Sequence, residues 1–344
     1  MRPHRGLAVL AILWLAFSTH PRAKSEPRAP FTYLILPFED SAPDPAREWL
    51  REGMALSLGE YLAGAGQQVV DREDRNLAME EMSLPSGAPL TLATSIRLGR
   101  LLRSDPDPPN PDRLVVGRYT VDQGRLTLSA RSLDLTADRA GPWKEREGSL
   151  TDLLQIQREV AANLLRGDGI SFERLSGKGD EAGAEQSFPL LAYENYIRGL
   201  IDSDPGRQQS FLRKAIQESP GYPKASFQLA RLLARAGKPA EAETVLARIL
   251  REPVPYRAEY HSLLGSLALG AGKLSEAEEE ARTSLALRET AEARLLMARI
   301  AQARGNLEEA RRELERAQSL DPDGPEVEAI RKLLGRGAGP PPKK

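Results

Sequence analysis

The sequence predicts an α+β amino-terminal domain followed by an all-α solenoid of paired helices. Within residues 31–166, strand-like apolar runs alternate with segments of helical periodicity. Beyond residue 188, pairs of a glycine and an alanine recur at steps of 35 and 33 residues, which indicates a repeat. Residues 167–187 lie between the two and are rich in Gly, Asp, Glu and Ser, a composition typical of a flexible linker.

The first half of the α+β domain is expected to run strand, helix, strand and two helices. Residues 31–37 are mostly apolar, β-branched or aromatic and predict a buried strand. A short second strand is expected at 68–70, with helices at 72–82 and 92–102. Residues 46–63 predict a helix because their apolar side chains recur at three- and four-residue steps and share one face: Trp49, Leu50, Met54, Leu58 and Leu62.

The second half of the domain predicts a hairpin and a closing helix. Strands are expected at 114–116, 125–135 and 142–147, and Gly124 supplies the positive φ that a tight turn before the second of these strands requires. A closing helix then begins at one of two possible caps, Ser149 or Thr151. Together these elements predict a mixed sheet with helices.

Four short motifs of this domain resemble the amino-terminal domain of TolB. They are LPFED at 36–40, WLREG at 49–53, VVDR at 69–72 and VG at 116–117. A module of this kind also occurs in bacterial TolB-like proteins that carry helical repeats. The resemblance covers residues 31–165 and departs from the family at a proline-rich insertion around 105–111. It implies a mixed sheet with helices that binds proteins of the bacterial envelope.

Small residues set the period of the carboxyl-terminal half. Three glycines are each followed, after four intervening residues, by an alanine: Gly237 with Ala242, Gly272 with Ala277, and Gly305 with Ala310. This pattern resembles tetratricopeptide repeats of about 34 residues, in which the glycine turns the chain between two helices and the alanine lets them approach closely. Other repeat positions agree: Leu229 with Ala230, Leu264 with Gly265, Met297 with Ala298, and the apolar Leu246 and Leu314.

Four such repeats are expected within residues 188–335, enough to bury a continuous core, which takes about three. The first is shortened around 204–206, and residues 325–334 would form a final helix that shields the last repeat. Residues 336–344 are expected to be a disordered tail on composition.

The amino terminus has the layout of a secretory signal. Two arginines among the first five residues precede an apolar run at 6–17 and then a polar stretch that contains prolines. A helix of this run would span about 18 Å, short of the roughly 30 Å hydrocarbon core of a membrane. A cleaved signal at 1–23 is therefore expected in preference to an amino-terminal membrane anchor. Its last residue is either Ser18 or Ala23.

The composition of the chain indicates where the protein is located and which classes of partner it binds. The chain contains no cysteine, so it needs no disulfides after export and offers no cysteine for lipid attachment. Its formal net charge of -1 provides no overall field for nucleic acid or an anionic membrane. No later apolar run approaches membrane length, so no integral membrane segment is expected once the signal is removed. These features favour a periplasmic or secreted bacterial protein.

Catalytic, metal and cofactor sites are not expected. His261 is the one histidine beyond the signal region, whereas metal sites and catalytic triads need clusters of His or Cys. His261 is expected to pack between helices. Glu39, Asp40 and Asp71 are the best acidic group of the first domain and are expected to serve turns and helix caps. No glycine-rich phosphate loop is present, and a hydrolase is disfavoured.

A protein-binding groove is expected on the first helix of each repeat. Basic groups in the second repeat would bind a carboxylate or acidic segment through bidentate hydrogen bonds, with ordinary solvated charge as the alternative. The positions expected to line it are Lys224, Phe227, Arg231 and Arg235 in the second repeat, Glu259, Ser262 and Ser266 in the third, and Glu292, Leu295, Arg299 and Gln302 in the fourth.

The sequence thus favours a non-enzymatic exported adaptor that binds protein partners of the bacterial cell envelope through both domains. The alternative is a regulatory module in which a cleft of the α+β domain senses a small molecule.

Overall fold

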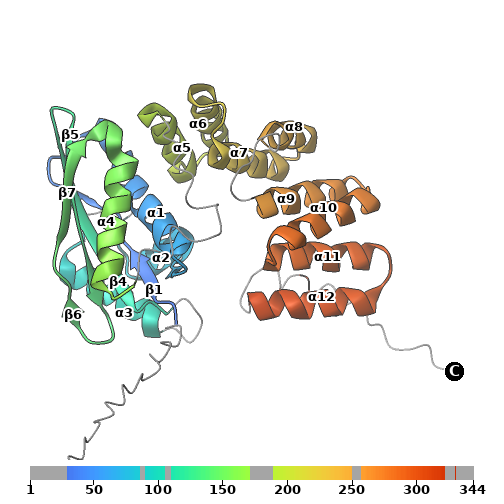
Figure 1. Ribbon diagram of the computed structural model, residues 1–344, viewed down its shortest axis with the longest axis horizontal. Helices are drawn as coiled ribbons and strands as arrows, with labels where there is room; N and C mark the ends of the chain where they lie inside the picture. Colours follow the sequence, from blue (N-terminus) through green and yellow to red (C-terminus); the bar gives the residue numbers. More distant parts are fainter. Residues whose placement is uncertain are drawn as a thin grey trace, which may run out of the picture. The chain divides into compact units, whose positions relative to one another are not determined.

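Figure 1 shows the computed structural model of the chain, which describes residues 29–85, 90–104, 110–170, 189–249, 257–321 and 330. In these residues a mixed sheet with helices is followed by a series of paired helices, so the predicted fold class is confirmed. The predicted signal and tail lie outside the described residues, as do most of the linker and all of the final helix except Ile330.

Seven strands within the described residues form one mixed sheet of order β3-β1-β4-β5-β6, in which β2 also pairs with β4 and β7 with β5. Strand β1 is parallel to β3 and β4, whereas β5 is antiparallel to β4, β6 and β7. The strands are β1 (Thr32–Ile35), β2 (Glu39–Asp40), β3 (Gln68–Val69), β4 (Arg113–Asp122), β5 (Arg125–Asp134), β6 (Arg139–Ala140) and β7 (Lys144–Ser149).

The β4–β5 hairpin forms where Gly124 predicted it. Asp122 pairs with Arg125, and the two turn residues Gln123 and Gly124 have φ values of 46° and 77°. Two positive φ angles in a two-residue loop match the right-handed twist of the strands. Strand β4 is much longer than the predicted 114–116, because polar residues that follow Val116 end the apolar pattern while the ladder continues to Asp122.

Helices cover both faces of the sheet. Alternation along β1 sends Tyr33 and Ile35 into a core with α1 (Trp49–Gly64) and α4 (Leu153–Gly167). The opposite face, with Leu34 and Leu36, packs against α2 (Arg72–Glu81) and α3 (Leu92–Ser104). Two single turns, η1 (Pro45–Arg47) and η2 (Leu150–Asp152), precede α1 and α4. Of the two possible caps, the Ser149 hydroxyl accepts from the Thr151 backbone N–H.

The first residues of the predicted linker belong to the folded sheet region. Asp168 accepts a hydrogen bond from the Tyr33 hydroxyl at 2.9 Å and pairs with Arg113 at 3.1 Å. Arg113 is 6% exposed and also pairs with Asp134 at 3.1 Å. Removing one member of a buried ion pair typically costs about 3–5 kcal/mol, so Asp168 helps to fix the end of α4 on the sheet.

Eight helices in the described residues form four consecutive pairs, as the repeat pattern predicted (Figure 1). Asp204 caps the second helix of the first pair by accepting from the Arg207 backbone N–H, and Pro205 follows it at a position that needs no N–H donor. The pairs are α5 (Leu190–Ile201) with α6 (Pro205–Glu218), α7 (Pro223–Arg235) with α8 (Pro239–Ile249), α9 (Arg257–Gly270) with α10 (Leu274–Leu287), and α11 (Ala291–Ala303) with α12 (Leu307–Leu320).

The small residues of the repeat act as predicted. The turn glycines Gly237, Gly272 and Gly305 have φ values of 72°, 75° and 79°, which a residue with a side chain rarely adopts. The alanines that follow them, Ala242, Ala277 and Ala310, are all 0% exposed. Each helix pair therefore turns at a glycine and closes over a methyl group.

The first helix pair is joined to the sheet region by α5. The buried Tyr193 hydroxyl donates to the Gly53 carbonyl of α1 at 2.9 Å and hydrogen bonds with the Ser57 hydroxyl. Burial raises the pKa of Tyr193 above its usual range, so this hydroxyl stays protonated. The Tyr193 ring meets Trp49 edge-on at 5.8 Å, and a Cβ on Gly53 would lie 3.3 Å from Ile197. Helices α1 and α5 are thus in direct contact through buried side chains.

Replacing any of the three buried alanines by tryptophan is expected to destabilise the repeats. Ala242→Trp, Ala277→Trp and Ala310→Trp each force a large ring into a closed helix contact, and overpacking costs about 1–3 kcal/mol or more. Urea denaturation followed by circular dichroism measures the loss. Ala303→Trp, at an exposed position of α11, is the matched control. Unchanged unfolding of all three buried variants would show that the repeat register is wrong.

Candidate functional site

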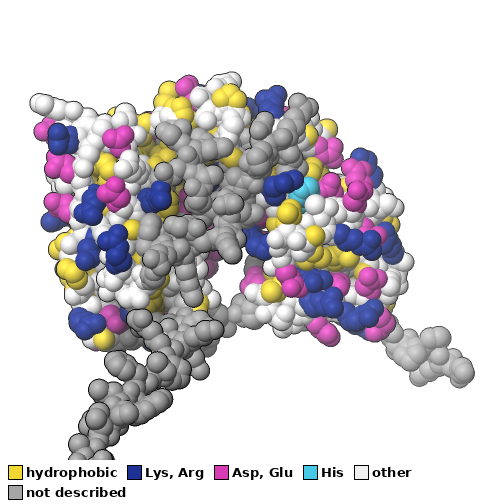
Figure 2. Space-filling view, viewed as in Figure 1, with side chains coloured by type: hydrophobic (Ala, Val, Ile, Leu, Met, Phe, Trp, Pro, Cys, Tyr) yellow, Lys and Arg dark blue, Asp and Glu magenta, His cyan; other side chains and the backbone are white. Residues whose placement is uncertain are grey.

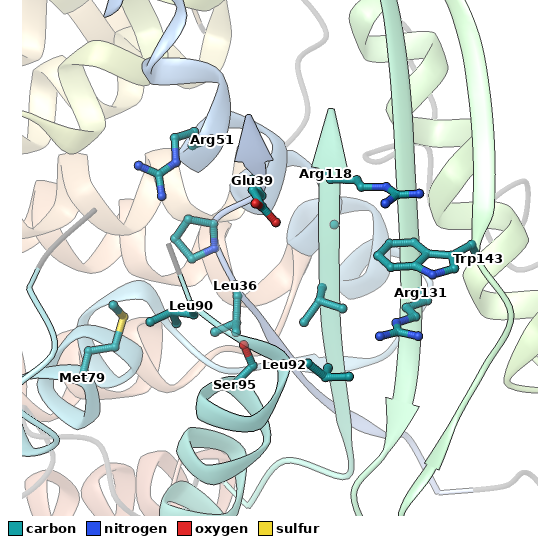
Figure 3. A pocket seen from close by; sticks show the side chains of 13 residues that line it. Leu36, Glu39, Arg51, Met79, Leu90, Leu92, Ser95, Arg118, Arg131 and Trp143 are labelled. Atoms are coloured by element: carbon teal, nitrogen blue, oxygen red, sulfur yellow. The ribbon is translucent and has the colours of Figure 1, made fainter. Parts of the chain in front are cut away.

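A cavity of about 220 Å³ opens on the sheet face that α2 and α3 cover only in part (Figure 3). One side of it is apolar and is formed by Leu36, Met79 and Leu90, among others. The other side is basic. Its thirteen lining residues come from β2, β4, β5, the helices α1, α2 and α3, and the segments that follow β1 and precede α3 and β7: Leu36, Pro37, Glu39, Arg51, Met79, Leu90, Leu92, Ser95, Val116, Gly117, Arg118, Arg131 and Trp143.

Two arginines flank one tryptophan at the basic side. The guanidinium carbons of Arg118 and Arg131 lie 4.8 and 4.6 Å from the centre of the Trp143 ring, and Figure 3 shows the indole between them. Strand register explains the grouping: Val116 of β4 lies opposite Arg131 of β5, so Arg118 follows two residues along on the same face. Stacking on an aromatic face leaves the in-plane N–H donors of a guanidinium available.

Gly117 allows the strand beside this cavity to form. A Cβ at this position would overlap the Phe38 ring, which packs directly on the Gly117 backbone. Phe38 is 1% exposed, so its ring has no room to move aside. The LPFED and VG motifs therefore meet in space: the phenylalanine of one packs on the glycine of the other.

The acidic residues predicted to serve turns do not gather into a metal site. Among the described residues, no group of three or more His, Cys, Asp or Glu side chains could hold a metal ion. Asp40 accepts from the Ala42 backbone N–H at 2.9 Å, as expected for a turn. Asp71 occupies the N-cap position of α2, as predicted, but its side chain makes no capping hydrogen bond. Glu39 lines the cavity instead.

The predicted groove is best developed on α7. Arg231 lies above the Phe227 ring at 5.9 Å, and Phe227 in turn packs on Tyr260 of α9 with ring centres 4.9 Å apart. Arg235, one turn beyond Arg231, is exposed. Lys224 instead pairs with Glu60 of α1 at 2.6 Å, so its charge is directed to the sheet region.

Later repeats bury two of the expected groove residues. Leu295 is 4% exposed and belongs to the core between α11 and α12, and Ser262 is 8% exposed and hydrogen bonds with Ser284 at 2.8 Å. Both side chains face the paired helix, so neither can line a groove. Arg299 and Glu292 are exposed, Gln302 and Ser266 are half-buried, and Glu259 pairs with Arg288.

The carboxyl-terminal helices match a known family. The model described as tetratricopeptide repeat matches residues 204–267 and 268–334, which span the helices from α6 onward. These residues are tetratricopeptide repeats. No curated protein matches the chain in sequence.

Several solved structures are similar to parts of the chain. A tetratricopeptide repeat protein from Parabacteroides merdae is 15% identical over 84% of this chain and 99% of its own, with a TM-score of 0.38. PilW, described as a type IV pilus biogenesis factor, is 22% identical over 52% and 82%, with a TM-score of 0.35. The LpoB carboxyl-terminal domain from Escherichia coli is 14% identical over 35% and 82%, with a TM-score of 0.27.

The tetratricopeptide repeats carry mixed charge on their surface. In Figure 2, side chains of both signs are interspersed over α9–α12. His261 joins the two helices of the third repeat, with its Nδ1 2.6 Å from a carboxylate oxygen of Glu280, which fits the packing role expected of it. Glu278 bridges Arg282 of its own helix and Arg304 at the end of α11, the first helix of the next repeat, and the hydrogen bond from Arg304 helps to lower the pKa of Glu278. The surface of α9–α12 that Figure 2 shows thus carries no extended patch of one sign.

Gly117→Ala is expected to destabilise the sheet region by about 1–3 kcal/mol, because the new methyl group overlaps the buried Phe38 ring. The unfolding free energy from urea denaturation measures it. Gly221→Ala is the matched control, since a Cβ there meets nothing within 4 Å. Equal stability of the two variants would contradict the close packing of Phe38 on Gly117.

Proposed function

We propose that this protein is a non-enzymatic adaptor that binds protein partners through its tetratricopeptide repeats. The match of residues 204–334 to that family is the observation that carries the proposal. Stacked helical repeats form extended surfaces that suit protein binding. The surface on α7, with Phe227, Arg231 and Arg235, supplies an aromatic ring and cations, and it fits an acidic or carboxylate-bearing segment of a partner.

The proposed location is the periplasm or the exterior of a bacterial cell, and the proposed partners are proteins of the cell envelope. The signal layout of residues 1–23 and the lack of cysteine support this. Among the described helices, none has the length and apolar character needed to cross a membrane.

The amino-terminal region is proposed to be a TolB-like module at residues 31–166, joined to repeats at 188–335 by the linker predicted at 167–187, whose first residues pack on the sheet region. The LPFED, WLREG, VVDR and VG motifs support the TolB-like identity. This module is proposed to contribute a second surface for envelope proteins.

A second candidate function is ligand sensing by the sheet region. The cavity that Arg118, Arg131 and Trp143 line on one side is the observation that favours it. A saturable increase in thermal stability with a small ligand would support this function.

Charge reversal at Arg231→Glu with Arg235→Glu is expected to weaken capture of the partner from an envelope extract. Binding through these cations is also expected to fall with salt, because the Debye length shortens from roughly 10 Å at 0.1 M to about 3 Å at 1 M. Partner recovery is measured at low and high salt after circular dichroism confirms folding. Arg311→Glu with Arg312→Glu, on exposed positions of α12, is the matched control.

The variant Phe227→Ala distinguishes a basic binding surface from an apolar one. If the double reversal binds like the unchanged protein while Phe227→Ala does not, the surface is apolar and not basic. If neither variant loses binding, the partner binds elsewhere, and the TolB-like module is the next surface to test.

Export is expected to remove the signal, so that the mature chain begins at Thr19 or at Lys24. Cell fractionation followed by mass spectrometry of the amino terminus measures this. Recovery of the uncleaved amino terminus in the membrane fraction would show that the apolar run at 6–17 is an anchor.

A further inference from the structure

We propose that the cavity of the sheet region binds the carboxylate of a small amphiphilic acid, held by Arg118 and Arg131 while its apolar part contacts Leu36, Met79 and Leu90. This inference deepens the second proposed function and rests on it. The ligand chemistry follows from the charge, the geometry and the size of the cavity.

The two arginines differ from three other arginines of the same sheet, Arg113, Arg125 and Arg146. Arg113 pairs with two carboxylates, Arg125 with Glu147 and Arg146 with Glu159. Within the part of the chain that the structure describes, no carboxylate forms an ion pair with Arg118 or Arg131. The Nε of Arg131 is buried and has no hydrogen-bond partner there. A buried donor without a partner is destabilising, so Arg131 is not held by the hydrogen bonds that hold Arg113.

The Trp143 ring contacts both guanidinium groups. Both lie within 5 Å of the ring centre, which suits cation–π contact and leaves their in-plane N–H groups for an acceptor. Planar donors of this kind bind carboxylates through paired hydrogen bonds. Glu39 is the single acidic residue among those lining the cavity, against three arginines, so the local charge still favours an anion.

The apolar side and the volume limit the rest of the ligand. Leu36, Met79 and Leu90 face the arginines across the cavity in Figure 3, so a fully polar anion would leave this wall unused. The cavity volume of about 220 Å³ is below the roughly 300–1,000 Å³ of most ligand pockets, which suits a small ligand. One amino-acid residue with a free carboxylate, or a short fatty acid, has this size.

The test compares three probes in calorimetric titrations of the purified protein. N-acetyl-leucine has the carboxylate and an apolar group, N-acetyl-leucine amide lacks the charge, and hexanoate lacks the peptide group. The acid is expected to bind at least about tenfold more tightly than the amide. Binding of N-acetyl-leucine alone identifies the carboxyl-terminal residue of a peptide as the source, whereas equal binding of hexanoate identifies a free small acid.

Variants then locate the site. Arg118→Gln and Arg131→Gln are each expected to weaken binding of the acid by about tenfold, and Arg139→Gln, an exposed arginine of β6, is expected to leave it unchanged. Tryptophan fluorescence should change on binding, and Trp143→Phe should abolish that change.

Equal affinity for acid and amide would overturn the carboxylate assignment while keeping a ligand-binding cavity. Absence of binding by all three probes would overturn the present inference, whereas a saturable thermal shift with another ligand would still support ligand sensing. If an arginine variant fails to fold, the acid–amide comparison on the unchanged protein still decides the question.

Discussion

The packing of α5 on α1 is the contact on which the rest of the architecture depends. A stack of helical repeats leaves an apolar face at each end, and that face must be covered. Here the sheet region covers the first repeat: Tyr193 inserts its ring beside Trp49 and hydrogen bonds to the backbone of Gly53. One apolar core then continues from the sheet through α1 and α5 to Tyr260 and Leu267 of α9. Helix α1 therefore packs on the sheet with one part of its surface and on the first repeat with another.

Side chains of minimal size make each close contact in this scheme possible. Gly53 allows α5 to approach α1, Gly117 allows the Phe38 ring to lie on β4, and Gly265 leaves space for Leu296 of the next repeat. The side chains of Ile197, Phe38 and Leu296 fill the space beside these glycines. Because packed interiors tolerate little change in volume, such positions constrain the sequence more tightly than the charged surface does.

The elements that were predicted correctly are determined by residues close to them in the sequence. The spacing of Gly237, Gly272 and Gly305 predicted the repeat period and the turns, and these glycines have the positive φ angles that such turns need. Gly124 predicted the hairpin in the same way. Features that depend on contacts between residues far apart in the sequence were not predicted. Strands β2 and β6 have two residues each, too few for a pattern, and Leu295 faces its partner helix although the repeat register predicted a groove position. The cavity also has no local signature, because Arg118, Arg131 and Trp143 come together through strand register.

The two candidate sites, the α7 surface and the cavity of the sheet region, pack on different hydrophobic cores. Their functions can therefore be tested separately. Phe227 of the α7 surface packs on the core that contains α1 and α4. Leu36 and Val116 of the cavity belong to the core on the other face of the sheet. Sites without shared partners usually contribute additively to stability. Substitutions in the cavity should therefore leave the repeat surface intact, and a binding defect in one set of variants can be assigned to its own site. Strand β1 supplies side chains to both cores, so the sheet is one route by which they could be energetically coupled.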